Sequence, residues 1–298
     1  METQTKKGIN WLIWAVWIAV AVLLVLVIIL ASAILRRSST PKEPQPEQIA
    51  TQSLPTETEV QEQEETAPAI DYPQLDLAPN PYGPEDFDFR GRYLECTAGE
   101  CTIGVDVSYW QGDINWPLVK AAGMEFAMIR LGWRGNTEGN IGEDSTGAAN
   151  YRGAKDAGLL VGAYFFSQAV TPEEAVEEAQ FVLDMIRDWK LDMPIVFDWE
   201  DAGGTRPIGM DPRTLTDCAK AFCQTIEDAG YEAMVYTNWN QAFYDFYLEE
   251  LTDYGLWLAM YEAEMVFPYK IDMWQYSCTG SVPGINGDVD LNIFFKYD

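Results

Sequence analysis

Two carboxylates, Asp198 and Glu200, end a short apolar run and are separated by one residue. The run, residues 194–197, has the composition of a buried strand, and successive side chains of a strand point to opposite faces. Asp198 and Glu200 would therefore share one face, with their Cα atoms ~6.6 Å apart at a rise of ~3.3 Å per residue. Paired acids at about this separation cleave glycosidic bonds. From these residues alone, a strand that ends in a solvated acidic loop is the alternative.

Two more acids, Asp106 and Asp290, lie in strand-like stretches at the two ends of the sequence that follows residue 103. If these strands belong to a closed barrel, all four carboxylates can reach one cleft. Converging negative charges raise the pKa of at least one carboxyl group, which then stays protonated and can serve as a general acid. Calcium binding by an acidic rim is the alternative, although the spacing lacks a loop of the EF-hand kind.

Aromatic side chains near the same strand ends offer flat apolar faces to sugar rings. The candidates for substrate contact are Tyr164, Tyr236, Trp274 and Tyr276. Ordinary core packing is the alternative for these four, and it is the preferred interpretation for Phe197 and Trp257.

The composition excludes several other chemistries. The 298 residues carry 47 acids and 19 bases, a net charge of -28, which argues against a nucleic-acid partner because phosphate binding requires a basic surface. The sequence has no histidine, which excludes Ser-His and Cys-His catalysis and histidine-ligated zinc. Its five cysteines form no C-x-x-C pair. We therefore expect carboxylate chemistry without a cofactor or a metal.

The acids must be positioned by the strand-like and helix-like stretches that alternate from residue 103 onward. The predicted strands cover residues 103–108, 124–131, 159–166, 194–200, 231–238, 255–261, 271–276 and 289–294, and helices near 115, 148–157, 171–186, 211–226 and 239–250 connect the first six. Repeated strand–helix units predict a parallel sheet, and eight strands suggest a closed α/β barrel. The two last connections are expected to be loops.

Two of the expected helices carry an apolar stripe and a start signal. The first begins with a capping box and proline at residues 171–174, and its stripe is Val176, Ala179, Leu183 and Ile186. The second begins at Asp211 and Pro212, and its stripe is Leu215, Cys218, Ala219, Phe222, Cys223 and Ile226. Cys218 and Cys223 lie too far apart around this helix to form a bond, so we expect core residues.

The N-terminal region is expected to lie in a membrane. Residues 11–31 contain no polar side chain, and this length can span a bilayer. We predict a cytoplasmic tail and transmembrane helix over residues 1–37, with membrane contact through residues 9–35. A cleaved signal peptide is the alternative because Ala31, Ser32 and Ala33 resemble a cleavage site, but its apolar core would run only ~7–15 residues. Basic residues on both flanks leave the orientation undecided.

A spacer and a barrel domain follow. Residues 38–92 are rich in proline and glutamate and are predicted to be a disordered spacer, since they bury too little apolar surface to fold. The barrel domain would cover residues 93–298 and begin with a tight hairpin around residues 97–100. Cys96 and Cys101 could close this hairpin as a disulfide, and free thiols are the alternative.

Several motifs resemble one known family. They are GVDVS and WQG at residues 104–108 and 110–112, AKDAGLLVGAY at 154–164, FDWE at 197–200, VYTN at 235–238, LWLA at 256–259, WQY at 274–276 and VDLN at 289–292. Their types and order resemble the family-25 glycoside hydrolases, lysozymes that act as N-acetylmuramidases. The resemblance implies an irregular TIM-like (β/α)5β3 barrel. It also implies that Glu200 is the general acid/base, Asp198 its partner, and Asp106 and Asp290 flanking acids.

The expected function follows from the motifs and the anchor together. It is a single-pass protein of the cell membrane whose extracellular catalytic domain remodels peptidoglycan. The enzyme would hydrolyse the β-1,4 bond between N-acetylmuramic acid and N-acetylglucosamine, with glycan strands as its partner. The alternatives are a catalytically silent wall-binding module and a hydrolase of a chitin-like polymer.

Overall fold

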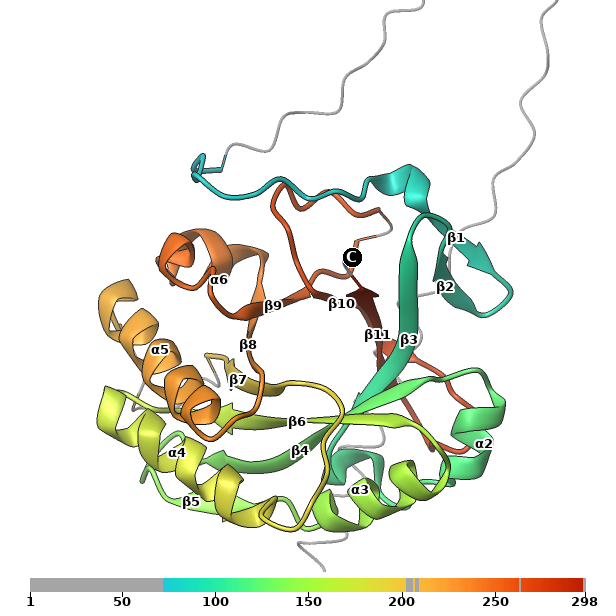
Figure 1. Cartoon of the computed structure of the whole chain (residues 1–298), viewed down its shortest axis with the longest axis horizontal. Coiled ribbons are helices and arrows are strands. Elements are labelled where there is room, and N and C mark those ends of the chain that lie inside the picture. The colour runs from blue at the N-terminus through green and yellow to red at the C-terminus, as the bar shows by residue number, and fades with distance from the viewer. Residues whose placement is uncertain (1–71, 202–205, 207–208, 263, 297–298) are drawn as a thin grey trace, which may run out of the picture. The chain divides into compact units, whose positions relative to one another are not determined.

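The fold is known from a computed structural model, which describes residues 72–201, 206, 209–262 and 264–296. The barrel strands are β3 (Glu100–Val107), β4 (Phe126–Arg134), β6 (Leu160–Ser167), β7 (Ile195–Trp199), β8 (Ala233–Asn238), β9 (Gly255–Ala259), β10 (Met273–Gly280) and β11 (Val289–Lys296). Around the ring, β3, β11, β10, β9, β8, β7, β6 and β4 are hydrogen-bonded neighbours, and β4 pairs with β3 to close it (Figure 1). The predicted eight-stranded barrel is therefore confirmed.

One strand runs against the predicted direction. The other barrel strands pair in parallel, whereas β11 is antiparallel to both β10 and β3. Residues 281–288 alone connect β10 to β11. A parallel return requires a crossover of about a dozen residues or more, so this short loop brings the chain back antiparallel. A short additional strand, β5 (Ile141–Glu143), extends the edge of β4.

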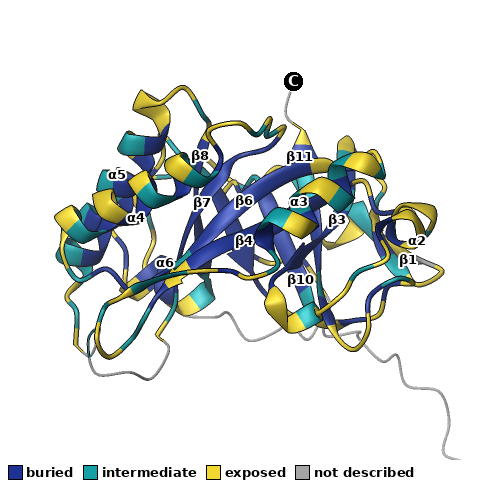
Figure 2. Ribbon diagram, turned by 90° about the horizontal axis from the view of Figure 1, so that it is seen from below, coloured by how far each residue is buried: buried dark blue, intermediate teal, exposed yellow. Residues whose placement is uncertain are grey.

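The five predicted helical connections are confirmed. They are α2 (Trp116–Ala121), α3 (Gly147–Asp156), α4 (Pro172–Met185), α5 (Pro212–Asp228) and α6 (Trp239–Tyr244), with short 3-10 turns η2 (Tyr109–Gln111) and η3 (Leu248–Glu250). In Figure 2 the helices α3, α4 and α5 are buried towards the strands and exposed on the other side. The barrel core therefore has an outer layer between strands and helices, as well as residues inside the ring.

The stripe predicted for α5 is correct, and the stripe predicted for α4 is wrong only at Val176, since Ala179 and Ile186 are buried and Leu183 packs partly buried against the core. All six stripe residues of α5 are buried, and the Asp211 side chain caps the helix by accepting a hydrogen bond from the Thr214 amide at 3.1 Å. On α4 the predicted Val176 is 41% exposed, and the buried face contains Ala175, Glu178, Ala179 and Val182. Glu178 binds Arg134 of β4, and this buried ion pair turns a charged residue towards the barrel.

The interior of the ring is filled up to its mouth by a second cluster of side chains. This cluster includes Phe126, Met128, Tyr164, Val196, Met234, Tyr236, Trp257 and Met273. They alternate along their strands with residues that face the helices, as the pleat requires. Cys218 and Cys223 are buried free thiols in the outer layer, as predicted.

The predicted border between spacer and barrel, at residue 92, is wrong. Residues 72–86 lie along the barrel as a strap: the Tyr72 ring contacts Trp239 with a centroid separation of 5.4 Å, and the Tyr82 ring stacks on Phe295 at 4.7 Å. Pro79 forms an antiparallel bridge with Tyr269. Aromatic side chains supply the apolar area that the proline- and glutamate-rich residues before them lack, so this part orders.

The predicted hairpin is displaced. The hairpin consists of β1 (Phe87–Arg90) and β2 (Tyr93–Cys96), and its turn contains Gly91 at φ 82°. Residues 97–99 instead connect β2 to the barrel strand β3, and a disulfide joins Cys96 to Cys101 across this connection.

The predicted membrane helix lies outside the described residues, as do residues 38–71 of the predicted spacer. Within the part of the chain that the structure describes, no helix is both long and apolar enough to span a bilayer.

Candidate active site

A cavity of about 580 Å³ opens among the C-terminal ends of the parallel strands. Its lining includes all four predicted acids, Asp106, Asp198, Glu200 and Asp290. They come from β3, the end of β7 and the start of β11. Because β11 is antiparallel, its first residues, rather than its last, lie at this mouth. The predicted convergence of the four carboxylates is confirmed.

Asp106 and Asp290 are side by side because they are register partners on β3 and β11. Asp106 is 6% exposed, and its Oδ2 accepts hydrogen bonds from Gln275 Nε2 and Asn292 Nδ2, both at 2.8 Å. Burial raises the pKa of Asp106 to about 6, although these two hydrogen bonds oppose the rise. Burial, followed by the charge of Asp106, raises the pKa of Asp290 to about 8.

Asp198 and Glu200 line the same cavity, as the predicted shared strand face requires. Asp198 is 5% exposed, and its Oδ1 is buried without a hydrogen-bond partner among the described residues. Burial, then the charge of Glu200, raises the pKa of Asp198 well above its usual range. Glu200 is partly exposed, and burial followed by the charge of Asp290 raises its pKa. This group of acids can therefore hold protons at pH values where isolated carboxyl groups have lost them.

Two of the four predicted aromatic residues line the cavity. Tyr164 and Tyr236 do so, and the Tyr236 hydroxyl donates a hydrogen bond to Gln275 Oε1 at 3.1 Å. The prediction for Trp274 and Tyr276 is wrong, because both belong to the outer layer; Trp274 Nε1 donates to the Met260 carbonyl at 2.7 Å. Side chains alternate along β10, so Gln275 between them is the residue that faces the cavity.

Further aromatic side chains at the rim were missed by the sequence analysis. Tyr261, 53% exposed, donates its hydroxyl hydrogen to Gln275 Oε1 at 2.7 Å. Tyr109, Trp110 and Trp133 also line the cavity, and Trp110 is 72% exposed. These residues lie in or near loops, where no periodicity marks them. Each lies directly after a barrel strand or among its last residues, and this position could have identified them as cavity residues.

Arg130 places a positive charge in the wall of this acidic cavity. Its Nε donates to Asp144 Oδ2 at 2.9 Å, and its guanidinium lies over the Tyr109 ring at 4.9 Å. The charge of Arg130 opposes the rise in the pKa of Asp198. Arg130 thus limits the repulsion among the acids.

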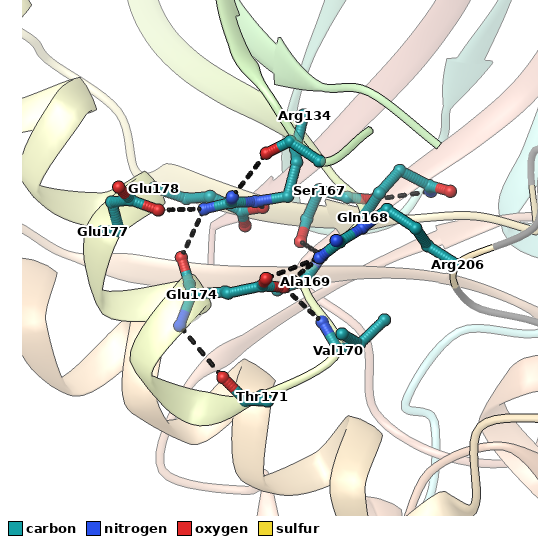
Figure 3. A network of polar contacts seen from close by, with 11 residues as sticks. Arg134, Ser167, Gln168, Ala169, Val170, Thr171, Glu174, Glu177, Glu178 and Arg206 are labelled. Atoms are coloured by element: carbon teal, nitrogen blue, oxygen red, sulfur yellow. Dashed lines mark hydrogen bonds and ion pairs between the residues drawn. The ribbon is translucent and has the colours of Figure 1, made fainter. Parts of the chain in front are cut away.

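A second guanidinium, that of Arg134, joins the rim of the cavity to α4 (Figure 3). Arg134 Nε donates to Glu178 Oε1 at 2.6 Å, and Nη2 donates to Glu177 Oε2 at 2.7 Å. Burial raises the pKa of Glu178 to about 7, against the effect of Arg134. Among the described residues, no group of three or more acidic, cysteine or histidine side chains is arranged to hold a metal ion.

Comparison with known proteins gives one consistent family. The family model described as glycosyl hydrolases family 25 matches residues 105–285. Lysozyme M1 of Streptomyces globisporus is 32% identical over 207 residues, which cover 64% of this chain and 67% of that protein. The solved structure of a bacterial lysozyme from Streptomyces coelicolor has a TM-score of 0.53 at 29% identity, covering 66% of this chain and 93% of that one.

The modular autolysin LytC from Streptococcus pneumoniae, solved with a synthetic peptidoglycan ligand, shares the fold. Its TM-score is 0.59 at 22% identity. The match covers 66% of this chain and 47% of LytC, so this chain spans about half the length of that relative.

Proposed function

The chain belongs to glycosyl hydrolase family 25, and from this premise we propose that it is an N-acetylmuramidase. It hydrolyses the β-1,4 bond between N-acetylmuramic acid and N-acetylglucosamine in peptidoglycan. The observation that carries the proposal is the single cavity that Asp106, Asp198, Glu200 and Asp290 line together. Similarity to lysozymes over most of the barrel supports the choice of substrate.

Glu200 is proposed as the general acid and base. Of the two acids at the end of β7 it is the more accessible, and its raised pKa favours the protonated form that a general acid needs. In the first step Glu200 gives its proton to the glycosidic oxygen while the bond from that oxygen to the anomeric carbon breaks. The leaving sugar departs as an alcohol, and Glu200 is left as a carboxylate.

The N-acetyl group of the substrate is proposed as the nucleophile. Its carbonyl oxygen bonds to the anomeric carbon as the glycosidic bond breaks, forming a positively charged oxazolinium ring. The carboxyl group of Asp198 orients this acetamido group and stabilises its charge. Glu200 then takes a proton from water, the water oxygen bonds to the anomeric carbon, and the ring opens to restore the acetamido group.

The rim residues suit a glycan strand. Tyr109, Trp110, Trp133 and Tyr261 present exposed aromatic surface beside the acids. Sugar rings carry apolar C–H faces that pack on such side chains, while their hydroxyl groups remain in solvent. Tyr164 and Tyr236 form the cavity wall nearer the barrel interior.

The location is proposed from the sequence. Residues 9–35 anchor the chain in the cell membrane, the N-terminus is inside, and the catalytic barrel is outside, where peptidoglycan is found. The apolar run over residues 11–31 and the extracellular substrate together support this orientation.

The test is product analysis. The purified full-length protein is incubated with peptidoglycan, and the new reducing ends are identified after borohydride labelling. Reduced N-acetylmuramic acid is the expected product. New N-acetylglucosamine ends, no new ends, or cleavage restricted to chitin-like polymers would each contradict the proposal.

A further inference from the structure

Strand β7 leaves the barrel sheet at the residues that carry its acids. Its register with β6 ends at the pair Ser167 and Trp199, and its register with β8 ends at Asp198 and Tyr236. Glu200 follows the last strand residue, so the ladder of β7 does not include it. A general acid in this position needs another means of fixing its backbone.

Two glutamine side chains hold the backbone at this point, one from each neighbouring strand connection. Gln168 Nε2 donates to the Glu200 carbonyl at 2.6 Å. Gln241 Nε2 donates to the Trp199 carbonyl at 3.1 Å. Gln168 directly follows β6, and Gln241 lies in the first turn of α6, which directly follows β8. The two amides therefore reach consecutive peptide groups of the chain from opposite sides.

Local hydrogen bonds fix the orientation of both amides. Gln168 Nε2 also donates to the Ser167 carbonyl at 2.7 Å, so the amide nitrogen faces two acceptors and a flipped amide would set oxygen against oxygen. Gln241 Oε1 accepts from the Asn238 amide at 3.3 Å and from Asn238 Nδ2 at 2.9 Å, leaving its nitrogen for Trp199. Each side chain is thus held before any substrate binds.

The segment that carries Gln168 is itself held in place. The Ala169 amide donates to Ser167 Oγ at 3.1 Å, and the Val170 amide donates to Glu174 Oε2 at 3.0 Å. Figure 3 shows this segment, residues 167–170, beside Glu174 of α4. These contacts fix the backbone on either side of Gln168 relative to α4.

Both amide groups are buried, and burial of a polar group destabilises the fold when its hydrogen bonds are incomplete. Gln168 is 0% exposed and Gln241 is 5% exposed. Gln168 Oε1 is buried without a partner among the described residues, and an unpartnered buried polar group destabilises the fold. An apolar side chain of similar volume would avoid this cost. What an apolar side chain could not do is hold the carbonyl of Glu200.

We propose that Gln168 and Gln241 are positioning residues that set the place of Glu200 over the glycosidic oxygen. This inference rests on the proposed role of Glu200 as the general acid and base. Proton transfer requires the donor within ~2.6–3.2 Å of its acceptor, and a displacement of ~1 Å can cost about 100-fold in rate. The two amides would act on turnover rather than on substrate affinity, because neither lines the cavity.

The test uses the full-length protein and three single variants. Gln168→Met keeps the side-chain length and removes the donor to Glu200. Gln241→Glu keeps an acceptor for Asn238 and removes the donor to Trp199. The matched control is Gln224→Met on α5, where an exposed glutamine donates to Asp228 Oδ1 at 2.9 Å. Muramidase kcat and KM are measured well below each variant's melting temperature, with circular dichroism to quantify the folded protein.

We expect kcat per folded molecule to fall by about 10-fold or more in Gln168→Met and in Gln241→Glu, with KM within about twofold of wild type. Gln224→Met should leave both constants unchanged. A purely structural role would lower the melting temperature but not kcat of the folded fraction, and that result overturns the inference. If Gln168→Met does not fold, Gln241→Glu decides by the same criterion. A wild-type protein that releases no muramic acid ends overturns the proposed function itself, whereas an active wild type with unaffected variants overturns only the positioning role.

Discussion

Asp106 and Asp290 face each other as register partners on antiparallel strands, one almost fully buried and the other partly exposed at the cavity mouth. The chain brings them together by reversing only its last strand. A parallel eighth strand would have carried Asp290, at its N-terminal end, to the opposite end of the barrel. The first prediction concerns the effect of Asp290 on Glu200, and the second concerns the proton affinity of the Asp106–Asp290 pair.

Replacing Asp290 with asparagine should move the alkaline limb of the activity profile to lower pH. Burial raises the pKa of Glu200, and the charge of Asp290 raises it further. Asp290 acquires this charge as it ionises towards pH 8, so in that range Glu200 of the variant loses its proton at lower pH, and the general acid is lost earlier as pH rises. The profile of kcat/KM against pH checks this. The exposed Asp288→Asn should leave the limb in place, and an upward shift in Asp290→Asn would contradict the prediction.

The same two acids should make wild-type stability fall as pH rises. The folded-state pKa values are about 6 for Asp106 and about 8 for Asp290. Unfolded aspartate titrates near ~3.9, so the folded protein binds more protons between these values and loses that stabilisation as pH rises towards 8.

This second prediction is checked by difference, because other carboxylates titrate as well. Unfolding free energies from urea titrations at pH 4 to 8 are compared between wild type and the double variant Asp106→Asn, Asp290→Asn. The wild-type value minus the variant value should decrease steadily with pH. A difference that is flat or grows would show that neither acid holds a proton in the folded state.

Glu200→Gln should abolish turnover while the protein remains folded and retains its affinity for glycan. Glutamine keeps the shape of the side chain but cannot supply or accept the proton, and general acid–base catalysis usually contributes ~10²–10⁴-fold. Turnover of muramyl substrate and binding to insoluble peptidoglycan are measured together. Glu227→Gln, an exposed change on α5, serves as the control. Activity above roughly a hundredth of wild type would remove Glu200 from its proposed role.

The reaction should proceed with net retention and without a covalent glycosyl-enzyme. The expected Cα separation of Asp198 and Glu200, ~6.6 Å, lies between the carboxyl distances typical of retaining and inverting enzymes, so the N-acetyl nucleophile decides the outcome. Product anomers recorded by NMR in the first minutes should be β. An initial α anomer would indicate inversion, and a trapped sugar ester on Asp198 would replace the acetamido group as nucleophile.

Protease added to intact, wall-stripped cells should release the catalytic barrel and leave an anchored stub. The proposed anchor over residues 9–35 and an extracellular substrate require this topology. An antibody against the barrel would detect the released fragment, and a cytoplasmic protein serves as the control for lysis. A barrel that resists protease until the cells are opened would reverse the orientation.

Periodicity and cap signals were sufficient to predict most of the barrel. The α5 stripe, its Asp211 cap and the strand positions depend on short-range patterns that tertiary contacts reinforce. These patterns could not show that β11 is antiparallel, because the alternation of side chains is the same for a parallel and an antiparallel strand. The α4 error had a tertiary cause: burial of Glu178 is stabilised by Arg134, a partner 44 residues away in sequence.

The acids of the site were predictable because each lies beside a recognisable strand. Trp274 and Tyr276 were wrongly predicted to contact substrate. Side chains alternate along β10, so of these three consecutive residues only Gln275 faces the cavity. Tyr261 and Trp110 were missed because a loop and the short 3-10 turn η2 show no hydrophobic periodicity. The roles of Gln168 and Gln241 could not be predicted either. They depend on tertiary hydrogen bonds to the carbonyl groups of Glu200 and Trp199, at the end of β7.

The docked strap over residues 72–86 changes how far the barrel can travel from its proposed anchor. A tether of residues 38–92 would extend up to ~170 Å as polyproline II, at ~3.1 Å per residue. With the chain packed on the barrel from Tyr72 onward, the proposed spacer would shorten to residues 38–71, which would span ~105 Å as polyproline II and ~30 Å as a flexible coil. The proposed enzyme would then reach only substrate within that distance of the membrane, and the contact of Tyr72 with Trp239 would set this limit.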